Sequence, residues 1–260
     1  MITTTDHWID VAQGRLFARI WQPPNPAEAP PIILLHDSLG CVALWRDFPE
    51  ALCAATGRRV IAYDRLGFGK SNPFPGRIPL DFIYNEYAAS LQPVCAELGI
   101  DRFVLFGHSV GGPIGVVSAA KLPAQCVGLV TESAQIFREE ITFEGIRAAK
   151  PVFAPGAPAY ERLRSYHGDK TDWVLRSWQD TWLDPTFEFD LSTYIAALRC
   201  PVLAIHGDCD EYGSTEQPKY LCAMTPGPKQ LLILENCGHV PHREQADKVL
   251  KAMAAFTQVA

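Results

Sequence analysis

The sequence lacks the segments that direct proteins into or across membranes. No apolar run approaches the roughly 20 residues needed to span a bilayer. Residues 1–8 have neither a basic start nor an apolar stretch. We therefore expect neither a signal peptide nor a membrane partner.

The cysteines lack the spacing of a disulfide framework or a structural metal site. All eight are scattered along the chain, and none forms a Cys-x-x-Cys pair. Secreted scaffolds and zinc sites cluster their cysteines, so a reducing cytoplasm is the expected location. Cys41, Cys209 and Cys237 fall in predicted loops near the candidate site described below. Because none has basic neighbours that would lower its thiol pKa, we interpret all three as apolar filling.

Positive charge is also scarce. The chain has 23 Lys+Arg against 29 Asp+Glu, a formal net charge of −6, and no basic run. This balance argues against nucleic acid or an anionic membrane as a partner. With 48% hydrophobic and 20% charged residues, the chain is neither a disordered segment nor a coiled coil.

Its 260 residues approach the upper limit of one hydrophobic core, which predicts one domain with an insertion. We expect a monomer or a homodimer.

Short apolar runs alternate with amphipathic segments along the chain. The runs are apolar on both faces and too short for helices, which is typical of parallel strands covered by helices on both sides. They occupy residues 32–35, 59–63, 103–106, 127–130, 202–205 and 231–234. An alternating segment at residues 8–21 predicts a β-hairpin before them. Helical patterns occupy residues 45–55, 82–98, 110–121 and 243–256, with a kink expected at Pro93. The alternation predicts an α/β fold with a mostly parallel central sheet flanked by helices.

This alternation stops between Ala134 and Ala197. The interruption contains three closely spaced prolines, followed by Trp173, Trp178 and Trp182 in a helix-like spacing. We predict a helical insertion at residues 134–197, after the sixth strand, between the two parts of one core, residues 1–133 and 198–260.

The strongest chemical motif follows the strand at residues 103–106. It reads Gly107-His108-Ser109-Val110-Gly111 and precedes a helical pattern. A Gly-x-Ser-x-Gly turn between strand and helix holds its serine in a strained conformation that exposes the side chain. Its glycines are required because Cβ atoms there would contact the neighbouring strand and helix. Ser109 is therefore the candidate nucleophile.

A serine nucleophile needs a base, and the last predicted strand is followed by a candidate. His239 stands in a loop after a glycine, and His242 is the competing histidine. No carboxylate or cysteine set with metal-ligand spacing surrounds this pair, so we predict no metal. A candidate acid, Asp210, follows the preceding strand at residues 202–205.

With these motifs the chain resembles the α/β-hydrolase family in its capped form. Ser109, Asp210 and His239 occur in the family's order at its usual strand ends, and the loops at residues 38–46 and 63–71 match as well. The resemblance implies a triad of these three residues, with Glu132 as the alternative acid. It also implies that the insertion at residues 134–197 is a helical cap, or lid, over the serine.

The resemblance implies an oxyanion hole formed by two backbone N–H groups, those of Val110 and Ser38. Relatives commonly have glycine where this chain has Asp37. We expect the Asp37 carboxylate to turn outward and accept hydrogen bonds from local backbone N–H groups. The alternative is contact with a cationic or hydroxylated part of the substrate.

The implied function is a serine hydrolase that cleaves small carboxylic esters or lactones through an acyl-enzyme, without a cofactor. Its partner would be a small-molecule substrate, in a pocket that includes Asp37, Trp173, Trp178 and Trp182. The same triad also fits a carbon–carbon bond hydrolase of ring-cleavage products and a cofactor-free haloperoxidase or perhydrolase. A ligand-binding sensor on a hydrolase fold is the alternative from another class.

Overall fold

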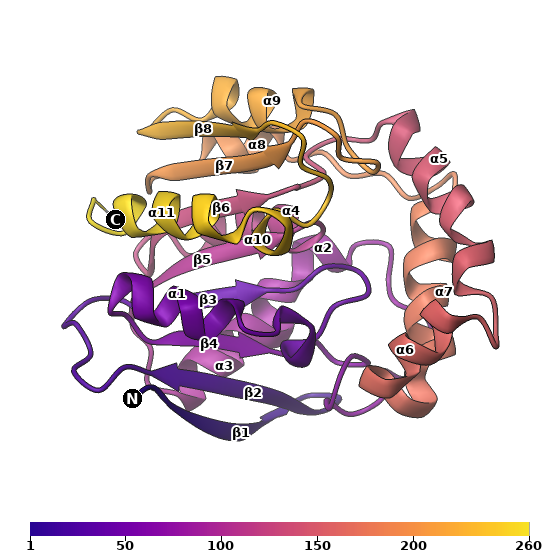
Figure 1. Cartoon of the computed structure of the whole chain (residues 1–260), viewed down its shortest axis with the longest axis horizontal. Helices are drawn as coiled ribbons and strands as arrows, with labels where there is room; N and C mark the ends of the chain where they lie inside the picture. The colour runs from indigo at the N-terminus through magenta and orange to yellow at the C-terminus, as the bar shows by residue number, and fades with distance from the viewer. Residues whose placement is uncertain (260) are drawn as a thin grey trace.

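The computed structural model describes residues 1–259, which form an α/β fold around one sheet (Figure 1). The sheet has eight strands in the order β1-β2-β4-β3-β5-β6-β7-β8. The strands are β1 Thr3–Val11, β2 Gly14–Gln22, β3 Ile32–Leu35, β4 Val60–Tyr63, β5 Phe103–His108, β6 Cys126–Glu132, β7 Val202–Gly207 and β8 Lys229–Leu234. The pairs β1–β2 and β2–β4 are antiparallel, and the other five pairs are parallel. The predicted hairpin and mostly parallel sheet are confirmed.

Helices cover both faces of the sheet because the central strands are apolar on both sides. One face packs α1 (Phe48–Thr56) and α11 (Ala246–Phe256) against a cluster that includes Leu34 and Phe106. On the opposite face, a cluster that includes Leu35 and Leu105 packs against further helices. They include α2 Phe82–Glu86, α3 Gln92–Glu97, α4 Gly111–Lys121, α8 Ser192–Ala196 and α9 Glu216–Met224. The alternation of side chains along β3 and β5 thus supplies two apolar layers.

Two helical regions differ in detail from the expectation. A kink was expected at Pro93, but Pro93 lies in the first turn of α3, where its missing N–H is tolerated. A π-helical turn, Tyr87–Leu91, joins α2 to α3 just before it. The helix expected at residues 243–256 is divided into α10 (Pro241–Glu244) and α11. Helix α9 (Glu216–Met224) was not predicted.

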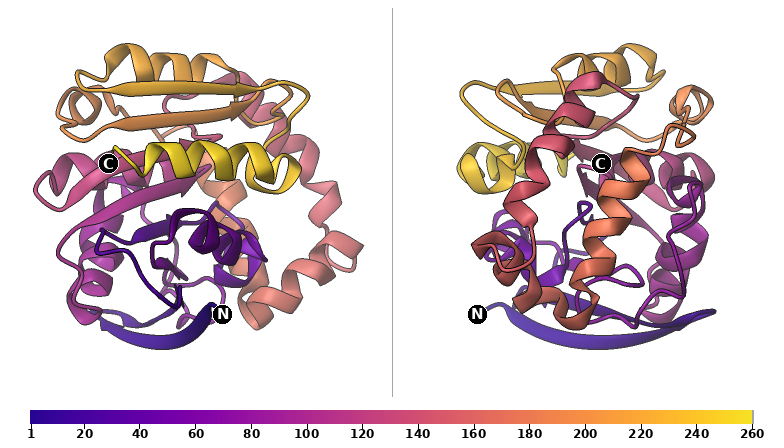
Figure 2. Two further views of the ribbon diagram at one scale, coloured as in Figure 1. Left: turned by 60° about the vertical axis from the view of Figure 1, so that its left-hand side comes forward. Right: turned by 90° about the vertical axis from the view of Figure 1, so that its right-hand side faces the viewer.

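Residues 133–201, which we call the inserted segment, connect β6 to β7 through further helices. They are α5 Glu140–Ala149, α6 Pro158–His167, α7 Thr171–Trp182 and α8. Helices α5, α6 and α7 stand at the end of the sheet toward which the parallel strands point (Figures 1 and 2). Helix α8 instead lies with the core helices, where Ile195 is fully buried.

Among residues 1–259, no helix has the length and apolarity to cross a membrane.

Candidate active site

Ser109 occupies a strained turn between β5 and α4. Its φ is 53°, a region that residues other than glycine rarely adopt. A Cβ on Gly107 would lie 2.1 Å from the carbonyl oxygen of Gly111, and a Cβ on Gly111 would lie 2.1 Å from that of Leu35. Both glycines are therefore needed, as the sequence indicates, because the turn packs directly against backbone atoms.

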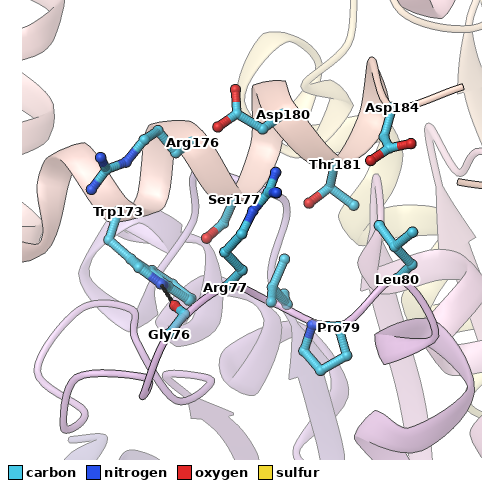
Figure 3. Close-up of a pocket in the computed structure, with 11 residues that line it drawn as sticks. Gly76, Arg77, Pro79, Leu80, Trp173, Arg176, Ser177, Asp180, Thr181 and Asp184 are labelled. Carbon is cyan, nitrogen blue, oxygen red and sulfur yellow. Dashed lines mark hydrogen bonds between the residues drawn. The ribbon is translucent and has the colours of Figure 1, made fainter. Parts of the chain in front are cut away.

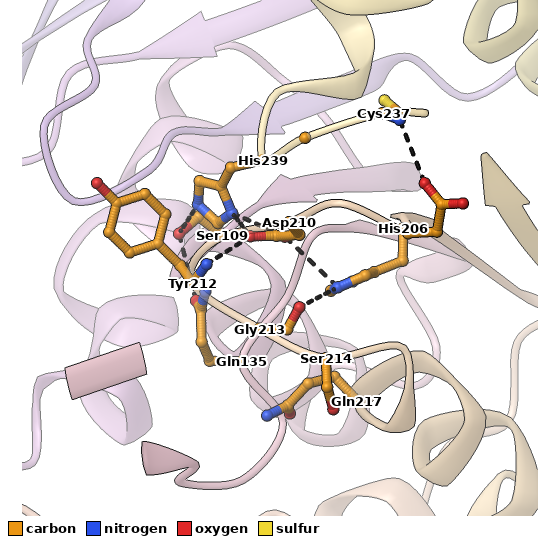
Figure 4. A network of polar contacts seen from close by, with 12 residues as sticks. Ser109, Gln135, His206, Asp210, Tyr212, Gly213, Ser214, Gln217, Cys237 and His239 are labelled. Atoms are coloured by element: carbon orange, nitrogen blue, oxygen red, sulfur yellow. Dashed lines mark hydrogen bonds and ion pairs between the residues drawn. The ribbon is translucent and has the colours of Figure 1, made fainter. Parts of the chain in front are cut away.

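His239 connects Ser109 to Asp210 in a chain of hydrogen bonds (Figure 4). Its Nε2 lies 3.0 Å from Ser109 Oγ. Its Nδ1 lies 2.8 Å from Asp210 Oδ1 and 2.9 Å from Asp210 Oδ2. The three side chains follow β5, β7 and β8, and parallel strands bring their carboxyl ends to one edge of the sheet. A nucleophile, a base and an orienting acid in this geometry can carry out acyl transfer.

Burial and charge act in opposite directions on the pKa values of this pair. Burial alone would raise the pKa of Asp210, but the positive field and hydrogen bond of His239 outweigh it, and the net pKa lies below its usual value. Burial alone would lower the pKa of His239, but the Asp210 charge outweighs it, and the net pKa is raised. The pairing therefore keeps Asp210 ionised and makes His239 a stronger base.

Further groups that the sequence reasoning did not identify hold the Asp210 loop. The backbone N–H of Tyr212 donates to Asp210 Oδ1 at 2.8 Å. His206, buried on β7, places its Nε2 3.4 Å from Asp210 Oδ2 and 2.9 Å from the carbonyl of Gly213. The Tyr212 ring packs edge-on to the His239 ring at 4.8 Å. The position of His206 just before a strand end was the only sequence signal for this role.

Gln135 is a second residue that the sequence reasoning missed. It is 3% exposed, and its Oε1 lies 3.2 Å from Ser109 Oγ (Figure 4). It follows β6 by three residues, so its place after a parallel strand could have marked it as a candidate. Its amide lies beside the reacting oxygen, where it can contact a bound substrate.

Glu132 contacts a different histidine from the one next to the serine. Its Oε2 lies 2.5 Å from His242 Nδ1, while His108 Nε2 lies 2.8 Å from the carbonyl oxygen of His239. Asp210, not Glu132, is thus hydrogen-bonded to His239. The three residues His108, Glu132 and His242 support the loop that carries His239.

The same three side chains are the one group of potential metal ligands found within residues 1–259, with donor atoms within 4.8 Å of one another. Burial raises the pKa of Glu132 to about 7, and it lowers the pKa of His108 to about 4 and of His242 to about 3. The neutral forms that burial favours suit hydrogen bonding. Because Glu132 is hydrogen-bonded to His242, and His108 to the carbonyl of His239, we interpret the cluster as structural support for the loop that carries His239.

The peptide between Asp37 and Ser38 is held from one side. The Asp37 carbonyl accepts hydrogen bonds from His36 Nδ1 and Arg65 Nη2, both at 2.8 Å. Because a trans peptide points its N–H opposite to its C=O, the Ser38 N–H is turned away from Arg65. Among residues 1–259, no hydrogen bond occupies the backbone N–H of Ser38 or of Val110. Both remain available as donors.

The Asp37 carboxylate does not behave as expected. No backbone N–H within the described chain donates to it, so the expected local hydrogen bonding is wrong. Asp37 Oδ1 instead lies so close to Gly40 that a Cβ on this glycine would be 1.9 Å away. The carboxylate thus lies over the loop at Gly40, and Asp37 is among the residues that line the cavity above Ser109.

A cavity of about 210 Å³ lies over Ser109 and His239. The inserted segment contributes Gln135, Thr142, Ile146, Phe153, Trp178 and Trp182 to its lining. Trp178 and Trp182 are four residues apart and so share a face of α7.

Trp173 does not line this cavity, so its predicted place in the pocket is wrong. It lies on another face of α7, where its Nε1 donates to the carbonyl of Gly76 at 2.6 Å and its ring stacks on Phe74. There it lines a separate surface cavity with Arg77 and Asp184 (Figure 3). Five residues turn a helix by about 500°, which separates Trp173 from Trp178 around the α7 axis.

Cys41 and Cys237 match the predicted filling role, whereas Cys209 is exposed and does not. Cys41 and Cys237 are buried, and burial raises the pKa of each thiol to about 12. Neither thiol is ionised near neutral pH. Cys209 is exposed, and its hydrogen bond with Asp208 raises its thiol pKa.

A family model and a known protein match this sequence over most of its length. A model described as "Alpha/beta hydrolase family" matches residues 32–252. The protein named "Putative carbamate hydrolase RutD" from Escherichia coli O7:K1 is 25% identical over 242 residues, covering 84% of this chain and 87% of that protein.

Solved structures show the same fold over nearly the full length. An esterase from Thermogutta terrifontis has a TM-score of 0.74 at 21% identity, covering 98% of both chains. An enol-lactonase from Burkholderia xenovorans LB400 has a TM-score of 0.76 at 21% identity, covering 97% of this chain and 100% of the other.

Proposed function

Because this chain belongs to the α/β-hydrolase family, we propose that it is a serine hydrolase of small carboxylic esters or lactones. The observation that carries the proposal is the hydrogen-bonded chain Ser109–His239–Asp210, with links of 3.0 and 2.8 Å, at the base of a cavity. A nucleophile, a base and an orienting acid must all be in reach for this chemistry.

In the proposed mechanism, Ser109 Oγ attacks the substrate carbonyl carbon while His239 Nε2 accepts the hydroxyl proton. The imidazolium then returns this proton to the leaving alkoxide, so that an alcohol departs and an acyl-enzyme remains. Water attacks the acyl group in the same way and releases the acid, which regenerates Ser109. Asp210 keeps the Nδ1 proton of His239 in place and stabilises the imidazolium.

The negative charge that develops on the carbonyl oxygen would be stabilised by the N–H groups of Ser38 and Val110. Each such donor contributes about 3 kcal/mol to the transition state in hydrolases of this kind. The support for this assignment is the orientation of the Asp37–Ser38 peptide, fixed by His36 and Arg65, and the unused N–H groups.

The proposed preference for small substrates rests on the size of the cavity. Its volume of about 210 Å³ is smaller than the roughly 300 Å³ at which drug-sized ligand sites begin. The relatives named as an esterase and an enol-lactonase are consistent with an ester or lactone carbonyl as the reacting group.

We extend the proposal to a location in the reducing cytoplasm, since the eight cysteines are free thiols.

Turnover of 4-nitrophenyl acetate and butyrate tests the proposal, with Ser109→Ala as the inactive control. We expect steady turnover by the natural sequence and loss of turnover in the variant. A fluorophosphonate probe should label the natural sequence and not Ser109→Ala. A chain that fails to label would contradict the proposal. Labelling with a single burst and no turnover would instead indicate a sensor that has kept a reactive serine.

A further inference from the structure

A second cavity opens beside the one that contains Ser109. Its volume is about 290 Å³, and it shares Asp37, Leu39 and Phe153 with the serine cavity. Its remaining lining includes three arginines, Arg46, Arg162 and Arg243. The two cavities therefore adjoin at these three residues.

None of these three arginines pairs with a carboxylate of the described chain, whereas three other arginines do. Arg19, Arg147 and Arg164 pair with Asp6, Glu140 and Glu161 at 2.6, 2.7 and 3.7 Å. Within residues 1–259, no ion pair joins Arg46, Arg162 or Arg243 to a carboxylate. Asp37 is the single carboxylate in the lining, so the guanidinium groups outnumber it.

Arg243 lines the cavity and feels the charges of both a carboxylate and another guanidinium group. Its Nη2 donates to the carbonyl oxygen of Leu44, two residues before Arg46. Burial lowers the pKa of Arg243, the charge of Asp37 raises it, and the positive charge of Arg46 lowers it by a smaller amount. Since the lining has three guanidinium groups and one carboxylate, a further anion would be attracted to the net positive charge there.

The arginines come from both regions of the molecule. Arg46 follows a short helical turn in the core, with φ at 53°, where glycine would be unstrained. Arg243 lies on α10, directly after the His239 loop, and Arg162 lies on α6 of the inserted segment beside Tyr166. An anion here would thus contact the core and the inserted segment at the same time.

We propose that this cavity binds a carboxylate or phosphate group carried by the substrate of Ser109. Planar guanidinium groups offer paired N–H donors to both anions, and charge-assisted hydrogen bonds to them are strong. The substrate would then be an ester or lactone with an anionic group at one end and its reacting carbonyl over Ser109. The claim that the anion belongs to a substrate of Ser109 rests on the proposed function. The claim that the cavity binds an anion does not.

Calorimetric titration of the intact protein tests binding independently of turnover. Glutarate and inorganic phosphate should bind, and glutaramide, the uncharged analogue of glutarate, should not. Arg162→Gln should weaken anion binding about tenfold, the usual scale for one lost charge-assisted contact. Arg164→Gln is the matched control, because this residue lies on the same helix, pairs with Glu161 and does not line the cavity.

Salt provides a second readout of the binding. Raising NaCl to about 0.5 M shortens the Debye length to about 4 Å and should weaken anion binding in the natural sequence. The relative affinities of glutarate and phosphate identify which of the two anions fits better.

Matched ester pairs test whether the anion belongs to the substrate. One pair carries the charge on the acyl side, mono-4-nitrophenyl glutarate against 4-nitrophenyl butyrate. The other carries it on the alcohol side, 4-acetoxybenzoate against its methyl ester. In one of the pairs, the ratio of kcat/KM for the anionic over the neutral ester should fall about tenfold in Arg162→Gln.

The outcomes separate the two proposals. Absence of anion binding, or turnover with no arginine-dependent preference in either pair, would overturn the anionic subsite. Arginine-dependent binding without turnover of any ester would keep the anion site and remove the ester-hydrolase proposal.

Discussion

Two regions of the molecule, the strand ends that carry Ser109, Asp210 and His239 and the inserted segment, are held in place by different contacts. At the strand ends, backbone geometry is decisive: Ser109 is fixed by a turn in which Gly107 and Gly111 approach carbonyl oxygens too closely for any Cβ. The inserted segment is docked by side chains. His167 on α6 accepts a hydrogen bond from the Gly69 N–H and donates to the Leu39 carbonyl, each at 2.9 Å.

Lys170 adds to this docking and shows why the two regions respond differently to change. Its Nζ donates to the carbonyls of Gly69 and Ser71, both at 2.6 Å. None of these contacts involves Ser109, Asp210 or His239. The difference suggests that changes at the strand ends abolish the reaction, whereas changes in the inserted segment alter which substrate reacts.

The largest expected effect concerns the acid at the strand ends. Asp210→Asn should lower kcat about 10⁴-fold, because the amide no longer holds the reactive tautomer of His239. Glu132→Gln should cost less than about tenfold, since this carboxyl contacts His242 instead and burial raises its pKa to about 7. Steady-state turnover of a 4-nitrophenyl ester measures both. The reverse ranking would make Glu132 the acid.

Replacing one glycine in each region tests how much close backbone packing contributes to the free energy of unfolding. Gly111→Ala should lower the free energy of unfolding by about 3 kcal/mol or more, because its Cβ would overlap the Leu35 carbonyl. Gly156→Ala, in the inserted segment, has φ of +85° and open space around it, so the strain alone should cost about 1 to 2 kcal/mol. Urea denaturation measures both. Equal losses would contradict the idea that close backbone packing is specific to the strand ends.

A smaller effect is expected from the tryptophans of α7. Trp178→Ala should enlarge the serine cavity and raise the ratio of kcat/KM for 4-nitrophenyl octanoate over butyrate about tenfold. Trp173→Ala is the matched control, because it lines the separate cavity, and the ratio should stay the same. Melting temperatures should be recorded for both variants, since each removes a large side chain. A similar change in both ratios would show that α7 acts through its position rather than through one face.

The smallest expected effect is a displacement of the pH profile. Activity requires neutral His239, and the Asp210 charge raises its pKa above the ordinary value of 6.5. The acid limb of kcat/KM should therefore have its midpoint above pH 6.5. In Asp210→Asn the residual activity should persist to lower pH, because the charge that favours the imidazolium is gone. A midpoint that does not respond to this substitution would assign the limb to another group.

Short sequence patterns predicted the parts of the candidate site that depend on neighbouring residues. The turn around Ser109 is encoded by two glycines and the flanking strand and helix, and the histidine after the last strand could be found by its position. Gln135 and His206 were missed because their contacts depend on loops that meet only in the folded chain. Trp173 was placed in the pocket because spacing along α7 does not reveal which face of the helix meets the serine.

The sequence by itself therefore determined the α/β architecture and the order Ser109, Asp210, His239, because alternating apolar runs and tight turns are local properties. Only the tertiary structure decided that Glu132 contacts His242, that Asp37 faces the cavity, and that Arg46, Arg162 and Arg243 line one space. These relations join segments far apart in the chain. They arise when the sheet brings its strand ends together and the inserted segment packs over them, which no local pattern records.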